Sequence, residues 1–260
     1  MSTVLKAFFK IYKKILTAHY SNMKRIILFI VSFIFLTTAY GYNKAEAERL
    51  LPIYRVDRAD NLISISFDCA WGDEYTDELL SVMDEYGVKS TFFTVEFWTK
   101  KYPERIKKIS ELGHEIGTHS KTHPHMSKMS KEQIRSELLS SKQAIEDITG
   151  KKVELFRAPF GEYDNEVISV ASELSLYTVQ WDVDSLDWKD LSAEEIANRI
   201  IKRVKSGSII LCHNNGLHTA ESLPIIFKDL KEKGFVFVPI GELIYKKNYK
   251  ILPDGTEILD

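Results

Sequence analysis

The sequence contains few cysteines, and its longest apolar run is short for a membrane span. Cys69 and Cys212 are the only two cysteines among 260 residues, so a disulfide framework cannot define the fold. The longest apolar run, residues 26–36, falls short of the roughly 20 residues that a transmembrane helix needs. No internal repeat or low-complexity segment is visible. With 44% hydrophobic and 28% charged residues, the chain is typical of a globular protein with one sizeable core.

Excess positive charge is absent from most of the chain. Residues 1–25 contain six basic residues and no acidic residue, so they carry +6. The whole chain carries −2, which leaves −8 on the remaining residues. The folded part is therefore not a nucleic-acid binder by bulk charge.

The basic segment and the apolar run 26–36 together predict an export signal. Ala39 and Gly41 supply the small residues of a cleavage site, so residues 1–41 read as a basic n-region plus signal peptide. An uncleaved membrane anchor is the alternative, and Met23 is a second possible start. We expect an exported protein, secreted or N-terminally anchored at the extracellular face of the membrane or in the cell wall. The membrane would be contacted only through this segment.

Beyond a polar tether at 42–61, strand-like runs alternate with amphipathic helical patterns over 62–245, and a C-terminal tail follows at 246–260. The expected strands are 62–67, 90–95, 114–118, 154–156, 177–180, 208–211 and 235–238. The expected helices are 76–86, 103–112, 131–148, 166–174, 193–204 and 219–233, and capping boxes at Ser130 and Ser192 begin two of them. This alternation predicts an α/β fold, a distorted, incomplete (β/α) barrel with about seven parallel strands. A doubly wound open sheet is the alternative.

Residues that can carry chemistry follow the ends of these strands, where β/α barrels build their active sites. His119 and His123 can reach one metal ion, although a histidine-rich surface loop is the plain alternative. Asp68 suits a general base that Arg157 could keep ionised. Alternatively, Asp68 caps a helix or stabilises a turn, and Arg157 is a surface residue. His213, opposite a carboxylate base, reads as an acid.

Five segments in this order resemble the motifs of the polysaccharide deacetylase (NodB homology) family, carbohydrate esterase family 4, sporulation-type branch. The matching segments are Ser66-Phe67-Asp68-Cys69, His119-Ser120-Lys121-Thr122-His123, Arg157-Ala158-Pro159-Phe160-Gly161, Asp187-Trp188 and Leu211-Cys212-His213. The resemblance implies an exported, metal-dependent hydrolase of carbon–nitrogen (non-peptide) bonds, which removes N-acetyl groups from cell-wall aminosugars in peptidoglycan or a chitin-like glycan. Its cofactor would be Zn²⁺ or another divalent cation such as Co²⁺.

The resemblance also implies a role for each matching residue. Asp68 would be the catalytic base and His213 the catalytic acid, with Arg157 tuning the base and Asp187 orienting the acid. Leu211, Trp188 and Phe160 would line the substrate pocket, and His119 and His123 would bind the metal.

Cys69 departs from the family pattern, which usually has an aspartate ligand at this position. A thiolate is a good zinc ligand, so Cys69 can be the third ligand. Alternatively, water or Asp73 completes a two-histidine site, Cys69 forms a disulfide, or no metal binds. A non-catalytic cell-wall or spore glycan-binding protein is therefore the competing interpretation. A zinc peptidase is disfavoured because His119-x-x-x-His123 lacks the glutamate of a His-Glu-x-x-His helix.

Overall fold

The computed structural model describes residues 6–7, 9–14, 17, 20, 23–24 and 49–260. The chain divides into two units, residues 1–48 and 49–260. In the first unit, the described residues are helical and exposed. The apolar run 26–36, the cleavage-site residues and the first part of the tether lie outside the described residues. Among the helices that the structure does describe, none combines the length and apolar character of a membrane span.

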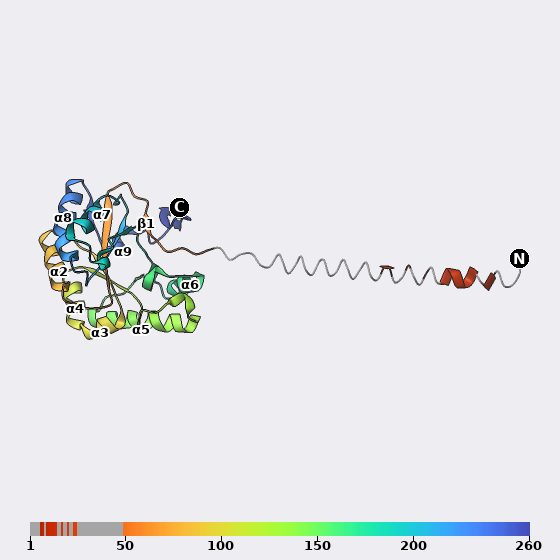
Figure 1. Cartoon of the computed structure of the whole chain (residues 1–260). Helices are drawn as coiled ribbons and strands as arrows, with labels where there is room; N and C mark the ends of the chain where they lie inside the picture. The colour runs from red at the N-terminus through yellow and green to blue at the C-terminus, as the bar shows by residue number, and fades with distance from the viewer. Residues whose placement is uncertain (1–5, 8, 15–16, 18–19, 21–22, 25–48) are drawn as a thin grey trace. The chain divides into compact units, whose positions relative to one another are not determined.

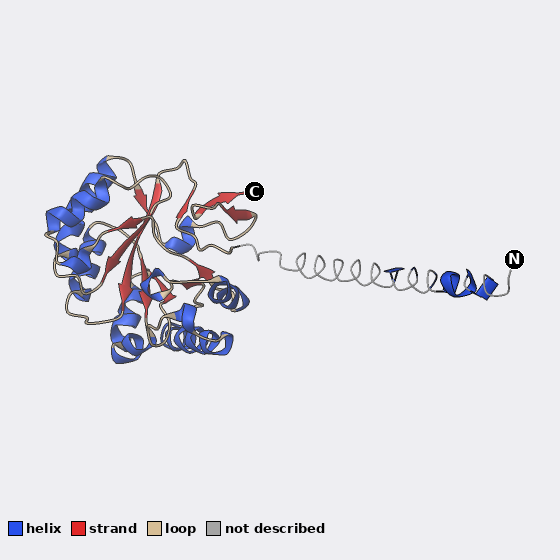
Figure 2. Cartoon of the chain, turned by 45° about the vertical axis from the view of Figure 1, so that its right-hand side comes forward, coloured by secondary structure: helices blue, strands red, loops and turns tan. Residues whose placement is uncertain are grey.

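Parallel strands form the centre of the second unit, and their order confirms the distorted, incomplete barrel (Figure 2). Seven strands follow one another in the order β6-β5-β4-β3-β2-β8-β7, and β9 pairs with the start of β2. Their bounds are β2 Leu62–Cys69, β3 Thr91–Thr94, β4 Glu115–Thr118, β5 Leu155–Phe156, β6 Tyr177–Thr178, β7 Val183–Asp184, β8 Ile209–His213 and β9 Val236–Phe237. Each expected strand is present, and β7 is an addition.

The two faces of the central strand β2 differ in chemistry. Ile63, Ile65 and Phe67 lie fully buried in the hydrophobic core. Ser66 belongs to the opposite face, because side chains alternate along a strand, and its hydroxyl donates to the Ile210 carbonyl at 2.7 Å. The same alternation assigns Asp68 to the polar, inner face of the barrel.

Helices cover the outer face of the sheet, as Figure 1 shows for α2, α4 and α8. Their bounds are α2 Thr76–Glu85, α3 Glu96–Lys101, α4 Pro103–Glu111, α5 Lys131–Thr149, α6 Asn165–Glu173, α7 Ala193–Ile201, α8 Thr219–Glu232 and α9 Ile240–Leu243. The predicted helices are confirmed to within a few residues, and the capping boxes at Ser130 and Ser192 are both formed. Sequence analysis did not predict α3 and α9, which are only six and four residues long.

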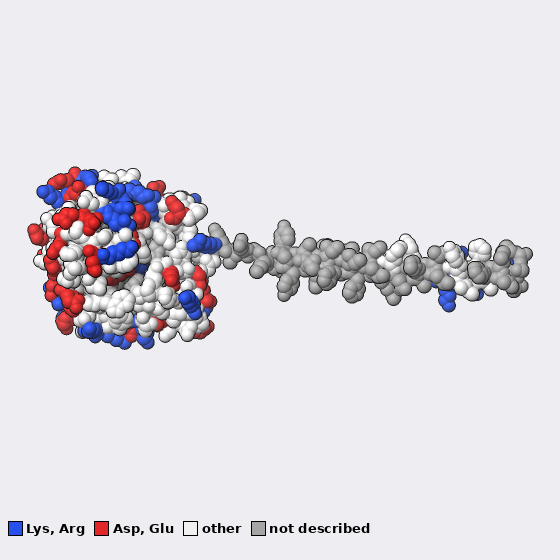
Figure 3. Space-filling model, in the orientation of Figure 1, with Lys and Arg blue, Asp and Glu red and all other residues white. Residues whose placement is uncertain are grey.

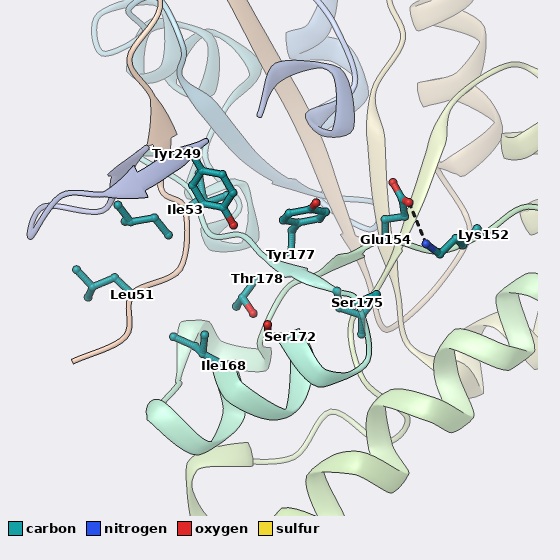
Figure 4. Close-up of a pocket in the computed structure, with 12 residues that line it drawn as sticks. Leu51, Ile53, Lys152, Glu154, Ile168, Ser172, Ser175, Tyr177, Thr178 and Tyr249 are labelled. Atoms are coloured by element: carbon teal, nitrogen blue, oxygen red, sulfur yellow. Dashed lines mark hydrogen bonds and ion pairs between the residues drawn. The ribbon is translucent and has the colours of Figure 1, made fainter. Parts of the chain in front are cut away.

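Residues 49–61 and 246–260, expected as a tether and a tail, are integral parts of the folded unit. Strand β1 (Arg55–Val56) pairs in parallel with β11 (Thr256–Leu259), which pairs in turn with β10 (Tyr249–Ile251). Figure 4 shows Tyr249 near Ile53 and Tyr177, where these segments line a cavity of about 320 Å³. Such short strands exist through tertiary pairing, so local sequence patterns do not reveal them.

Candidate active site

The candidate site lies at the carboxyl ends of the parallel strands. Asp68 is near the end of β2, His119 and Arg157 directly follow β4 and β5, and His213 ends β8. Asp187 begins the short 3₁₀ helix η3 (Asp187–Lys189), after β7. A cavity of about 570 Å³ opens here. Its lining residues are Asp68, Ala70, Trp71, His119, His123, Phe160, Trp181, Asp184, Trp188, Leu211, His213 and Asn215.

Asp68 and Arg157 form a buried ion pair at the base of the cavity. The Arg157 Nη1 atom donates to Asp68 Oδ1 at 2.8 Å, while its Nη2 atom donates to Ser66 Oγ at 2.9 Å and to the Gln180 carbonyl at 3.2 Å. Burial raises the pKa of Asp68, but the charge and hydrogen bond of Arg157, together with the interactions of Asp68 with His119 and His213, outweigh burial, so this pKa lies below its usual value. Asp68 is therefore a carboxylate near neutral pH, in a single orientation.

His119 and His123 lie together beside Asp68. Their ring centroids are 4.9 Å apart, and His119 Nε2 is 3.5 Å from Asp68 Oδ2. The Nδ1 atom of His119 lies 2.8 Å from the Arg157 carbonyl, which fixes Nδ1 as the protonated nitrogen and leaves the Nε2 lone pair free. Burial lowers the pKa of both imidazoles, to about 4 for His123. Both side chains are therefore neutral at pH 7, the form that binds metals.

The loop that carries these histidines is held by Glu137, a residue that sequence analysis missed. Its buried carboxylate accepts hydrogen bonds from the backbone N–H groups of Lys121 and Thr122 at 2.9 and 2.8 Å, and from the Thr122 hydroxyl at 2.9 Å. The loop needs this support because His123, like Ser120, adopts a positive φ angle. An acid on the apolar face of helix α5 was the signal that could have revealed it.

The Cys69 side chain does not face the imidazoles of His119 and His123. Because it follows Asp68 on β2, its side chain belongs to the opposite face, where it is fully buried in the hydrophobic core. Its thiol lies 3.8 Å from the Phe67 carbonyl, and burial raises its pKa well above the usual value, so it stays protonated. Both described cysteines are free, so no disulfide joins Cys69 to Cys212.

The donor set therefore fits a metal ion in part. The His123 Nδ1 atom is buried and has no hydrogen-bond partner among the described residues, so this imidazole keeps one nitrogen unused by the protein. Within that same part of the chain, no group of three or more histidine, cysteine, aspartate or glutamate side chains is arranged around one point. Asp73, the other suggested donor, pairs with Arg105 at 3.0 Å.

His213 and Asp187 form the second charged pair of the cavity. The His213 Nδ1 atom lies 2.7 Å from Asp187 Oδ1, and Asp187 Oδ2 accepts from the His213 backbone N–H at 2.7 Å and from the Thr219 hydroxyl at 2.8 Å. Burial lowers the pKa of His213, but the hydrogen bond and charge of Asp187 outweigh it, so this pKa is raised. Asp187 thus favours an imidazolium that is held in one orientation.

Aromatic side chains form the rim of the cavity. The exposed fractions of Trp71, Phe160 and Trp188 are 58%, 55% and 57%. Leu211 also lines the cavity but is buried. Sequence analysis did not single out Trp181, which also lines the cavity, although it shortly follows β6 in the same way that the other site residues follow their strands.

The cavity of this parallel α/β barrel contains a carboxylate that can act as a base and a carboxylate-bound imidazole that can act as an acid. Two neutral imidazoles that can bind a metal lie beside them. These are the groups that a metal-dependent hydrolase uses. Residues 55–179 match the model of the family described as polysaccharide deacetylase. A peptidoglycan-N-acetylglucosamine deacetylase of Bacillus cereus is 32% identical over 75% of this chain and 93% of the relative. The chain belongs to this family, carbohydrate esterase family 4, whose catalytically active members hydrolyse N-acetyl amide bonds.

Two further relatives are less informative about activity. An uncharacterized Bacillus subtilis protein, YlxY, is 34% identical over 74% of this chain, and the match spans 60% of that relative's length. The crystal structure of BA3943 from Bacillus anthracis, described as a pseudoenzyme of the same family, has a TM-score of 0.73 and 33% identity. The similarity covers 75% of this chain and 69% of BA3943. Membership of the family is therefore compatible with either presence or loss of catalysis.

Proposed function

We propose that this protein is an exported, metal-dependent N-deacetylase that hydrolyses the N-acetyl amide bonds of N-acetylglucosamine residues in cell-wall glycan, which yields acetate and a free amine on the sugar. One observation carries the proposal: an ionised Asp68 and an imidazole with raised pKa, His213, line the same cavity as two neutral histidines. Amide hydrolysis needs a base for the attacking water and an acid for the departing nitrogen, and this cavity contains one group suited to each role. The deacetylase activity of the Bacillus cereus relative supports the choice of substrate.

The chain's own residues divide the reaction between them. Asp68 accepts a proton from the water that attacks the acetyl carbonyl, and Arg157 keeps Asp68 charged and correctly oriented. His213 donates a proton to the amine nitrogen as the carbon–nitrogen bond breaks. Asp187 holds Nδ1 of His213, so the Nε2 proton is the one available to the substrate. Leu211 and Trp188 line the part of the cavity where the acetyl methyl group would pack, and Phe160 lies at the rim, so the carbonyl stays open to the attacking water.

His119 and His123 would hold a divalent ion, zinc or a substitute such as cobalt. When bound, the ion would polarise the acetyl carbonyl and stabilise the negative charge that develops on its oxygen. With two imidazoles as its protein donors, we expect the ion to bind more weakly than at a three-residue site.

Acetate release from peptidoglycan fragments by Asp68→Asn and a matched control tests the assignment of the base. Asp147→Asn makes the same chemical change at an exposed carboxylate on α5, outside the cavity. We expect Asp68→Asn to lose essentially all turnover, Asp147→Asn to match the unmodified protein, and both to keep the native circular dichroism spectrum. Retained acetate release by Asp68→Asn would refute the role proposed for this carboxylate.

Glycan binding without catalysis is a second candidate function. Two observations favour it: the Cys69 thiol is buried in the core instead of joining the two imidazoles, and BA3943 is described as a pseudoenzyme. Saturable binding of glycan with no acetate release in the presence of zinc, cobalt or manganese would establish it in place of hydrolysis.

Export is supported by the charge pattern of the N-terminal segment, in which six basic residues precede the apolar run 26–36. Amino-terminal sequencing of the protein from the culture medium and from the membrane fraction tests this part of the proposal. A new amino terminus near Gly41 would indicate cleavage, whereas an intact chain in the membrane fraction would indicate an anchor. Recovery of an intact chain from the cytoplasm alone would contradict export.

A further inference from the structure

Trp71 exposes a large apolar surface that the proposed hydrolysis does not require. Its side chain is 58% exposed at the rim of the cavity. An exposed apolar patch beside a polar cavity often marks a binding surface, because covering it with a ligand removes apolar area from water. None of the proton transfers assigned to Asp68 and His213 involves the indole. The position of Trp71 therefore points to substrate recognition.

The backbone that follows Trp71 is held in a fixed position. The Gly72 carbonyl accepts hydrogen bonds from Trp98 Nε1 at 2.6 Å and from Asn214 Nδ2 at 2.9 Å, and both donor residues are buried. Gly72 itself has a φ of +65°, a conformation that favours glycine. The next residue, Asp73, is fixed by its ion pair with a helix α4 arginine. A ligand that stacks on Trp71 would thus bind beside a backbone segment that is already ordered.

Trp71 is part of a continuous aromatic surface. Its ring contacts His123 edge-on, with centroids 4.9 Å apart and planes inclined at 67°. Phe160 contacts His123 in a similar way, at 4.5 Å and 75°. The side chains of Asp184 and Asn215 line the same cavity and offer polar partners for hydroxyl groups. Aromatic faces beside hydrogen-bonding groups suit sugars, whose rings have an apolar C–H face and a polar edge.

We propose that Trp71 is a stacking platform for a sugar residue adjacent to the one that is deacetylated. The chain would then discriminate in favour of glycan oligomers over a single N-acetylated sugar. This inference rests on the proposed function and specifies that its substrate is recognised across more than one sugar unit. Loss of the stacked ring should weaken oligomer binding roughly tenfold and leave monomer binding unchanged.

Binding measurements on the full chain separate this inference from catalysis. In an Asp68→Asn background, isothermal titration would compare N-acetylglucosamine with its β-1,4-linked tetramer. We expect Trp71→Ala to lose about tenfold in tetramer affinity, Trp71→Phe to recover most of it, and monomer affinity to stay constant. Leu139→Ala, which removes an exposed apolar side chain from helix α5, is the matched control and should change neither affinity.

Zinc affinity, measured by competition with a chromophoric chelator, should be the same with and without Trp71→Ala. A changed zinc affinity would mean that the substitution acts through His123, and the platform would be rejected. Equal losses for monomer and tetramer, or no loss, would also overturn it. If the unmodified protein releases no acetate but its tetramer binding still depends on Trp71, the proposed hydrolysis fails and the platform stands.

Discussion

Asp187→Asn tests the pairing that makes His213 an acid. Asp187 is fully buried and bonds to both the ring and the backbone of His213. A hydrogen bond to a charged group contributes about 1.5–3 kcal/mol. Its loss from the imidazolium form corresponds to a decrease in kcat/KM of about 10- to 150-fold. Acetate release measured against pH is the assay.

The pH profile of kcat/KM distinguishes this mechanism from simple disruption. Burial lowers the pKa of His213 and Asp187 raises it, so the substitution should move the alkaline limb of the profile to lower pH. Thr219→Val is the matched control, because it removes one hydrogen bond to Asp187 but keeps the carboxylate charge. It should leave the alkaline limb in place. An unchanged limb in Asp187→Asn would refute the role of His213 as the acid.

Three other predictions concern the metal loop, the core and the C-terminal hairpin. Glu137→Gln should weaken zinc binding and lower the free energy of unfolding by about 1–3 kcal/mol, because a buried charged acceptor of three hydrogen bonds is lost. Chelator competition and urea unfolding measure these effects, and Asp147→Asn, at an exposed carboxylate on the same helix, should change neither quantity. Cys69→Ala should leave zinc affinity within about twofold and cost about 1 kcal/mol of stability, whereas a large loss of zinc affinity would make Cys69 a ligand. Burial raises the pKa of Glu257 from 4.5 to about 7, so the folded state favours the protonated carboxyl group. The contribution of Glu257 to the free energy of unfolding is therefore complete below pH 4.5 and is lost as pH rises through about 7. Glu257→Gln should therefore remove this pH dependence from urea unfolding, and the same dependence in both proteins would contradict the assignment.

Sequence patterns predicted the central strands and the candidate site better than the edges of the fold. Long elements such as α5 carry their own periodicity and caps, whereas β1, β7 and β10 are two or three residues long and exist through pairing with distant segments. For this reason, the sequence patterns did not predict that residues 49–61 and 246–260 belong to the folded unit.

The site residues show the same division between local and tertiary information. Strand ends identified Asp68 and His213 because parallel strands bring their carboxyl ends to one edge. Side chains alternate along β2, so Cys69 faces the core when Asp68 faces the cavity. The burial of Cys69 could therefore have been predicted from the sequence. The hydrogen bonds from the histidine loop to Glu137 could not have been predicted in this way, because they depend on how α5 packs beside β4.

Metal-dependent release of acetate is the most direct test of the proposed function. The full chain would be stripped with a chelator and incubated with N-acetylated peptidoglycan fragments and chitooligosaccharides, before and after addition of zinc. We predict that acetate release disappears with the chelator and returns with zinc, and that Asp68→Asn shows none in either condition. No release by the unmodified protein with zinc, cobalt or manganese on any of these glycans would contradict the account and favour glycan binding without catalysis.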